Sequence, residues 1–135
     1  MKDKGRRMRD EARRQGRNLK DRTKDFALAV IRLYGKLPQK MEARTIGNQV
    51  LRSGTSVGAH YREAQRAKSN ADFISKMEGG LQELEETQYW LELLAESGLV
   101  LREDLSDLER EVNELLAIFV SIVNKTKSKT KQARV

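Results

Sequence analysis

The residue types that usually perform catalysis occur in this chain without the arrangements that catalysis requires. His60 is the only histidine, and it lacks a second ligand such as the Glu-x-x-His of di-iron helical bundles. A surface or interface position is therefore favoured over a metal-binding role. The pair Gly79-Gly80 follows no predicted strand and precedes no Gly-Lys-Ser/Thr, so it is not a phosphate-binding loop. No cysteine is present, which excludes thiol chemistry. We therefore expect no catalytic residues, no metal and no cofactor.

Two other polar groups have a similarly plain interpretation. Ser53, Thr55 and Ser56 have no general base that the sequence can identify. Five glutamates scatter around one predicted helix and mostly avoid its apolar stripe, which is typical of a solvated face. These glutamates are Glu83, Glu85, Glu86, Glu92 and Glu96.

The charge of the chain is unevenly distributed. The net charge is +7, from 27 Lys/Arg and 20 Asp/Glu. Residues 1–24 hold eleven basic and four acidic side chains, and residues 25–76 hold nine and four. Residues 77–123 hold two and twelve, whereas residues 124–135 hold five and none. Basic segments bind polyanions through counterion release. The alternative is that the basic ends only aid solubility.

The candidate phosphate-binding residues fall into two groups. Arg52, Arg62 and Arg66 lie within an arc of about 80° on one predicted helix. Their guanidinium groups can bind phosphate, or they can pair with the acidic second half of the chain, and both interpretations stay open. The terminal segments have no such local partners, which favours them for phosphate contact. Their candidates are Arg6, Arg7, Arg9, Arg13, Arg14, Arg17, Lys125, Lys127, Lys129 and Lys131. Base-specific readout is not indicated, since no RNA-recognition aromatic pair is present.

Apolar periodicity predicts four helices and no strand. We expect helices over about 21–36, 43–68, 70–97 and 106–123. Pro38 ends the first helix. Asn70 is the expected N-cap of the third helix, and Gly98 is its expected stop. Ser106 and Glu109 form a capping box for the fourth helix, although a start one turn earlier is compatible with the pattern.

Four amphipathic helices with short connections indicate an all-α protein, an antiparallel four-helix bundle. The predicted domain covers residues 21–123, preceded by a basic arm (1–20) and followed by a basic tail (124–135) that we expect to fray. The longest apolar stretch, Leu115–Val123, is too short to span a bilayer. A cytoplasmic protein without a membrane partner is the default expectation.

Glycines and surplus apolar residues point to close packing and assembly. Gly47, Gly54 and Gly58 flank the apolar stripe of the second helix, which favours close approach of a neighbouring helix over a kink or a broken helix near Gly54. The last two helices carry more apolar surface than one bundle buries. We therefore predict a homo-oligomer, with a broad core as the alternative. The predicted interface residues are Tyr89, Trp90, Leu93, Ile118 and Val120.

Four runs carry a resemblance to a known family: RSGTSVGA (52–59), YREA (61–64), DF (72–73) and EETQYWL (85–91). Together they closely resemble the bacterial four-helix bundle protein family, whose founding members are encoded in intervening sequences of the 23S rRNA gene. The resemblance covers about residues 26–123. It implies an antiparallel four-helix bundle that assembles as a homopentameric barrel, with no enzymatic activity. It also implies structural helix–helix or subunit hydrogen bonds for Ser53, Thr55, Ser56 and Glu63.

A related branch of this family comprises the accessory variability determinant proteins of diversity-generating retroelements. Those proteins are basic and pentameric, bind nucleic acid, and associate with a reverse transcriptase and its template RNA. The long basic ends of this chain resemble that branch, although many family members with the same motif have no known retroelement.

Three functional hypotheses follow. The leading one is a non-enzymatic, oligomeric RNA- or DNA-binding scaffold that serves as an accessory partner of a reverse transcriptase and its template RNA. The alternative is a protein-interaction or assembly module with no direct nucleic-acid role. An enzyme with a carboxylate site is disfavoured.

Overall fold

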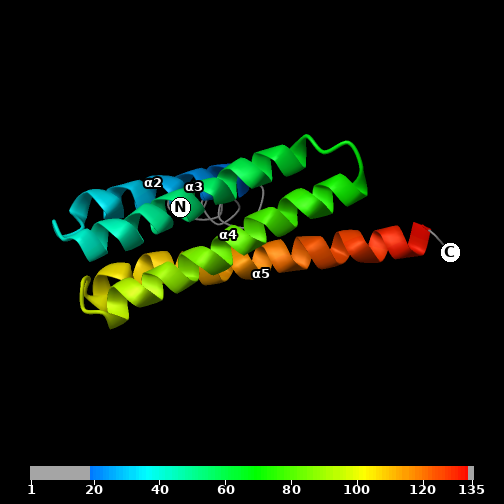
Figure 1. Ribbon diagram of the computed structural model, residues 1–135. Coiled ribbons are helices and arrows are strands. Elements are labelled where there is room, and N and C mark those ends of the chain that lie inside the picture. Colours follow the sequence, from blue (N-terminus) through cyan, green and yellow to red (C-terminus); the bar gives the residue numbers. More distant parts are fainter. Residues whose placement is uncertain (1–18, 134–135) are drawn as a thin grey trace, which may run out of the picture.

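The computed structural model describes residues 19–133, which form four antiparallel helices joined by short connections (Figure 1). The helices are α2 (Leu19–Lys36), α3 (Met41–Gln65), α4 (Asn70–Glu96) and α5 (Arg102–Ala133). α3 packs against both α2 and α4, and α5 packs mainly against α4, whereas α2 and α5 contact each other only lightly. The predicted all-α, four-helix fold is confirmed. No helix among the described residues is long and apolar enough to cross a membrane.

The core consists of the apolar stripes that the periodicity indicates. In each helix about one residue per turn faces the interior of the bundle. These side chains form a single cluster along the bundle. Burial of such stripes is the main source of stability in helical bundles. The largest fully buried side chains are Phe26, Val30, Val50, Val57, Met77, Leu84, Leu91, Leu94, Leu105, Val112, Leu115 and Phe119.

The three glycines of α3 face α2. A Cβ atom at Gly54 would lie 2.8 Å from Cγ2 of Val30, and one at Gly58 would lie 3.2 Å from Oγ1 of Thr23. Gly47 has the same orientation, toward the end of α2. α3 runs unbroken through all three positions. The predicted close approach is confirmed, and the alternative of a helix broken near Gly54 is wrong.

The C-terminal end of α4 lies where the sequence predicted it, whereas the N-cap is a different residue from the predicted one. Ser69, not Asn70, is the N-cap: its Oγ accepts a hydrogen bond from the backbone N–H of Asp72 at 3.0 Å. Asn70 is the first helical residue. Serine and asparagine are comparably good caps, so two adjacent candidates could not be separated by type. Gly98 adopts φ +79° and ends α4 as predicted.

α5 is longer than predicted at both ends. It begins at Arg102, and the Ser106 hydroxyl donates to the Glu103 carbonyl at 2.9 Å, so the predicted capping box is wrong. The helix continues to Ala133, so the expectation that the tail frays after residue 123 is also wrong. The tail lies beside the start of α4, where Asn70 Nδ2 approaches Thr130 Oγ1 at 3.5 Å. This neighbouring helix supports a lysine-rich segment that has little apolar surface of its own.

Two further boundaries shift slightly. α3 ends at Gln65, three residues before the predicted end. Within the described residues α2 starts at Leu19, which is 2% exposed. The predicted division between arm and bundle after residue 20 therefore falls inside α2.

The glycine contact gives a stability prediction. Gly54→Ala should lower the free energy of unfolding by about 1–3 kcal/mol, because the new methyl group meets fully buried Val30. In a Val30→Ala background the same substitution should be neutral or stabilising, since alanine has the higher helix propensity. Urea unfolding of the four members of this cycle measures the coupling. Equal effects in both backgrounds would contradict the close contact.

The corrected cap gives a second prediction. Ser69→Ala should cost about 1 kcal/mol of stability, because the N–H of Asp72 loses its acceptor. Asn70→Ala is the matched control and should change stability by less than half as much. Thermal unfolding of both variants decides the assignment, and a larger loss for Asn70→Ala would return the cap to that residue.

Candidate nucleic-acid interface

The two helical hairpins carry opposite charge. Residues 19–69, which include α2 and α3, hold eleven basic and four acidic side chains. Residues 70–123, which include α4 and most of α5, hold three basic and thirteen acidic side chains. The hairpins therefore attract each other where they meet, and the outer surface of the α2–α3 hairpin is strongly cationic.

Arg22 joins α2 to α5, where the two helices contact each other only lightly. Its Nε and Nη2 atoms donate to the Glu111 carboxylate at 3.1 and 2.6 Å, and Nη2 lies 3.3 Å from Glu114. The Arg22 side chain is only 14% exposed. The hydrogen bond to Glu111 raises the pKa of Arg22, against the opposing effect of burial. Arg22 is not among the residues predicted from the sequence, although the charge asymmetry between the two halves of the chain is the signal that could have identified it.

Arg52 is used within the fold. Its Nη2 lies 2.6 Å from Glu86, and its Nη1 lies 3.3 Å from Glu83. Of the two interpretations of the helical arginines, pairing with the acidic helices therefore holds for Arg52. Two members of the glutamate group that looked like a solvated face are its partners.

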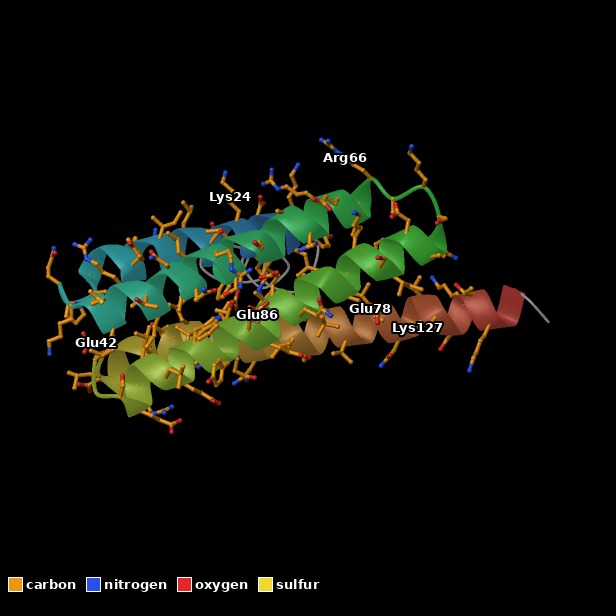
Figure 2. All side chains as sticks on the ribbon, viewed as in Figure 1. Lys24, Glu42, Arg66, Glu78, Glu86 and Lys127 are labelled. Carbon is orange, nitrogen blue, oxygen red and sulfur yellow. The ribbon has the colours of Figure 1, made fainter. Side chains whose placement is uncertain are left out.

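Arg62 and Arg66 differ from Arg52. Both are exposed near the end of α3, and neither makes an ion pair with any residue between 19 and 133. Figure 2 shows Arg66 pointing away from α4 and α5, on the same side as Lys24. Exposed Lys68 follows in the connection to α4. The predicted group of three arginines is thus divided between a structural and an available set.

The lysines of the tail are divided in the same way. Lys127 lies 3.4 Å from Glu78 of α4, and Figure 2 shows this pair on adjoining helices. The expectation that the tail has no local partners is wrong for this residue. Lys125, Lys129 and Lys131 are exposed and make no ion pair within the described part of the chain. The arginines predicted in the arm, at positions 6, 7, 9, 13, 14 and 17, lie outside the described residues.

The available cations gather at one end of the bundle. The contact between Asn70 and Thr130 places the tail beside the α3–α4 connection. Acidic neighbours there are already engaged: Glu63 pairs with Lys76 at 3.2 Å, and Glu78 pairs with Lys127. We call this surface the basic end; it comprises Arg62, Arg66, Lys68, Lys125, Lys129 and Lys131.

The predicted interface residues are exposed to different degrees. Tyr89 and Val120 are 52% and 43% exposed. Trp90 and Ile118 pack partly against the core of their own chain, and Leu93 is half-buried. Leu28 and Ile31 of α2 are 41% and 48% exposed, and they are not among the predicted interface residues. A plot of α2 at about 100° per residue would have found them, because they lie opposite its core stripe.

The hydroxyl-bearing residues of the family-like motif make structural hydrogen bonds. Ser53 Oγ lies 2.7 Å from Thr87 Oγ1 in the buried α3–α4 contact. Thr55 and Ser56 donate to backbone carbonyls one turn earlier in α3, at 2.7 and 2.6 Å. The helix–helix hydrogen bond that the resemblance implied is present for Ser53. Among the described residues Thr55 and Ser56 bond within their own helix instead, and Glu63 contacts α4 through an ion pair with Lys76.

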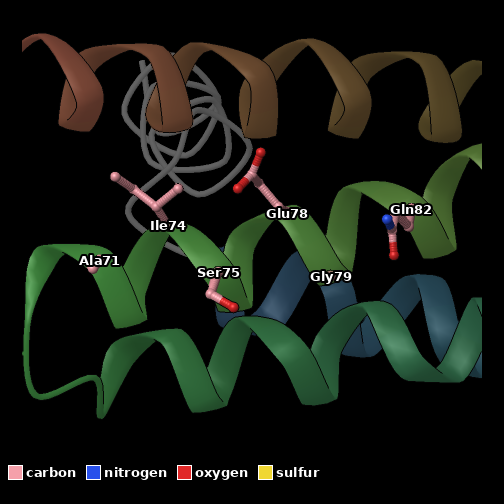
Figure 3. A pocket seen from close by; sticks show the side chains of 6 residues that line it. All are labelled: Ala71, Ile74, Ser75, Glu78, Gly79 and Gln82. Atoms are coloured by element: carbon pink, nitrogen blue, oxygen red, sulfur yellow. The ribbon is translucent and has the colours of Figure 1, made fainter.

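A shallow groove follows the outer face of α4 between α3 and α5 (Figure 3). Its lining residues are Ala71, Ile74, Ser75, Glu78, Gly79 and Gln82. Its one carboxylate is already paired with Lys127. The ring of His60 packs against Gly79, where a Cβ atom would lie 2.8 Å from Nδ1. Within residues 19–133 no group of three or more His, Cys, Asp or Glu side chains could hold a metal ion.

Comparisons with known proteins show which family the helical part of the chain matches. The family described as 23S rRNA-intervening sequence protein matches residues 18–121. A crystal structure from Bacteroides thetaiotaomicron, of a protein with unknown function from the S23 ribosomal protein family, is 39% identical and superposes with a TM-score of 0.73. The match covers 77% of this chain and 96% of that chain. Among curated proteins, none matches. The lysines at positions 125–131 lie outside the family match.

The two arginine contacts between the hairpins should differ in their effect on stability. Arg22→Gln should lower the free energy of unfolding by about 1.5–3 kcal/mol, because charge-assisted hydrogen bonds at a half-buried site are lost. Arg52→Gln should cost less than about 1 kcal/mol, since that side chain is 48% exposed and its ion pairs are screened by water. Urea unfolding measures both losses. An equal or larger loss for Arg52→Gln would contradict this ranking.

Proposed function

Since the chain belongs to the 23S rRNA-intervening sequence protein family, we propose that it is a non-enzymatic, homo-oligomeric scaffold that binds RNA or DNA. The resemblance to accessory variability determinant proteins makes the proposal more specific. It suggests a pentameric, cytoplasmic partner of a reverse transcriptase and its template RNA.

The basic end is the observation that carries the proposal. Its six side chains are exposed and make no ion pair within residues 19–133. The cations that face the acidic hairpin, Arg22 and Arg52, are in contrast paired. Like charges held on one surface repel each other and concentrate counterions. A polyanion that replaces those counterions gains the entropy of their release.

The geometry fits phosphates better than bases. Arg62 and Arg66 can each donate two parallel hydrogen bonds to a phosphate, while the lysines act as mobile point charges. Such contacts position a nucleic acid without reading its sequence. The expected binding is therefore tolerant of sequence and strongly dependent on salt. Assembly would multiply the basic ends and raise the apparent affinity for a long RNA.

The test is fluorescence anisotropy with a structured RNA across a NaCl series. The double variant Arg62→Glu/Arg66→Glu should weaken binding at least tenfold at low salt. It should also make the slope of log affinity against log salt shallower by about 1–2, since each lost phosphate contact contributes about 0.7–0.9.

Arg110→Glu is the control, because it makes the same kind of substitution once on the acidic hairpin, where Arg110 pairs only with Asp107 among residues 19–133. It should bind RNA almost as the native protein does. A flat salt response of the native protein, or equal losses in the variant and the control, would contradict the proposal.

A protein-interaction module is the second candidate, and exposed Tyr89 and Val120 favour it. Aromatic side chains left on a surface are enriched at protein interfaces. Pull-down from a nuclease-treated lysate distinguishes the two candidates. Retention of a specific protein without any binding of purified RNA would favour the interaction module.

A further inference from the structure

α2 carries an outward-facing stripe that takes no part in the core formed by the described residues. The stripe begins with Lys20 and Lys24 and continues with Leu28 and Ile31, and all four side chains are exposed. They lie on the side of α2 away from the fully buried Val30. The two lysines make no ion pair with any described residue. The stripe is thus cationic in its first half and apolar in its second half.

α4 carries an outward-facing stripe of complementary character. It consists of Glu78, Gln82, Glu85 and Tyr89, in that order along the helix. Two shallow grooves follow this face of α4, and Gln82 lines both. Figure 3 shows the first groove, with α4 lying between its two neighbouring helices. Glu85 makes no ion pair within residues 19–133, and Tyr89 is 52% exposed. The stripe is acidic first and aromatic at its end.

The two stripes match in length as well as in chemistry. Each spans twelve residues, from Lys20 to Ile31 and from Glu78 to Tyr89. At about 1.5 Å per residue, both are about 16 Å long. A parallel alignment places Lys20 opposite Glu78 at one end and Ile31 opposite Tyr89 at the other. Lys24 then lies opposite Gln82, and its long, flexible side chain reaches Glu85 about one helical turn further along. An antiparallel alignment would place Lys20 on Tyr89 and Ile31 on Glu78, which pairs charge with apolar surface.

One chain cannot bring its own two stripes together. α3 lies between α2 and α4, which run in the same direction through the bundle (Figure 1). The stripes face outward on separate helices. They can meet only between two copies that are oriented alike, which is a heterologous, head-to-tail contact.

We propose that the α2 stripe of one copy docks on the α4 stripe of a second copy, with Lys24 beside Glu85 and Ile31 against Tyr89. This inference rests on the homo-oligomeric part of the proposed function and identifies the surfaces that form it. The basic end lies outside both stripes and stays available to nucleic acid.

Charge reversal tests the contact. Glu85→Lys and Lys24→Glu should each raise the protein concentration needed for half-maximal association about tenfold, measured by sedimentation velocity of the full chain. Combining both substitutions in one chain should restore association, because the pair is reversed and not removed. An equimolar mixture of the two single variants should associate more strongly than either variant alone, because every contact between unlike variants pairs a lysine with a glutamate. Asp107→Lys, the same charge change on an exposed position of α5, is the control and should associate normally.

Three outcomes would overturn the inference: a native protein that is monomeric at all concentrations, an Asp107→Lys variant as impaired as Glu85→Lys, or a double variant that does not recover. Circular dichroism verifies that each variant keeps its helices, which is expected because the mutated side chains are exposed. RNA binding of the same samples separates the two proposals. A native monomer that binds RNA contradicts the homo-oligomer and its docking contact but not nucleic-acid binding, whereas an oligomer that binds no RNA contradicts only nucleic-acid binding. A native oligomer that is insensitive to the charge reversals contradicts only the docking contact.

Discussion

The attraction between a basic and an acidic hairpin organises this protein. Where the hairpins meet, Arg22 and Arg52 form ion pairs with glutamates of α5 and α4. The other basic side chains of the basic hairpin are exposed, and the acidic hairpin does not neutralise them. Opposite charges thus hold the two hairpins in one register and leave an excess of positive charge on the surface. Fold and candidate function depend on the same distribution of side chains.

Close packing makes this distribution a rigid one. The glycine face of α3 lets α2 approach until Val30 and Thr23 would touch any added methyl group. On the other side, Gly80 of α4 faces Phe119, where a Cβ atom would lie 2.7 Å from Cε2. A bundle packed this tightly fixes the ends of its helices relative to one another. The α3–α4 connection and the end of α5 therefore present their cations together.

Much of the fold could be predicted because it depends on periodicity within single helices: the four apolar stripes, the glycine face and the stop at Gly98. Contacts across helices could not. Whether Arg52 is free or paired depends on the register that brings Glu83 and Glu86 beside it. The same holds for Lys127, and for the end of α5, which needs α4 as a neighbour. The predicted terminal and helical cations were reasonable candidates, but their gathering at one end is a property of the three-dimensional structure.

Lysine acetylation footprinting by mass spectrometry, with and without a structured RNA, tests the central claim most directly. Bound RNA should shield the lysines of the basic end, Lys68, Lys125, Lys129 and Lys131, from the reagent. Lys36 and Lys40, at the opposite end of the bundle, provide the internal reference and should react equally in both samples. Selective protection of the basic end is the predicted result. Uniform protection of all lysines, or protection of Lys36 and Lys40 alone, would contradict the account.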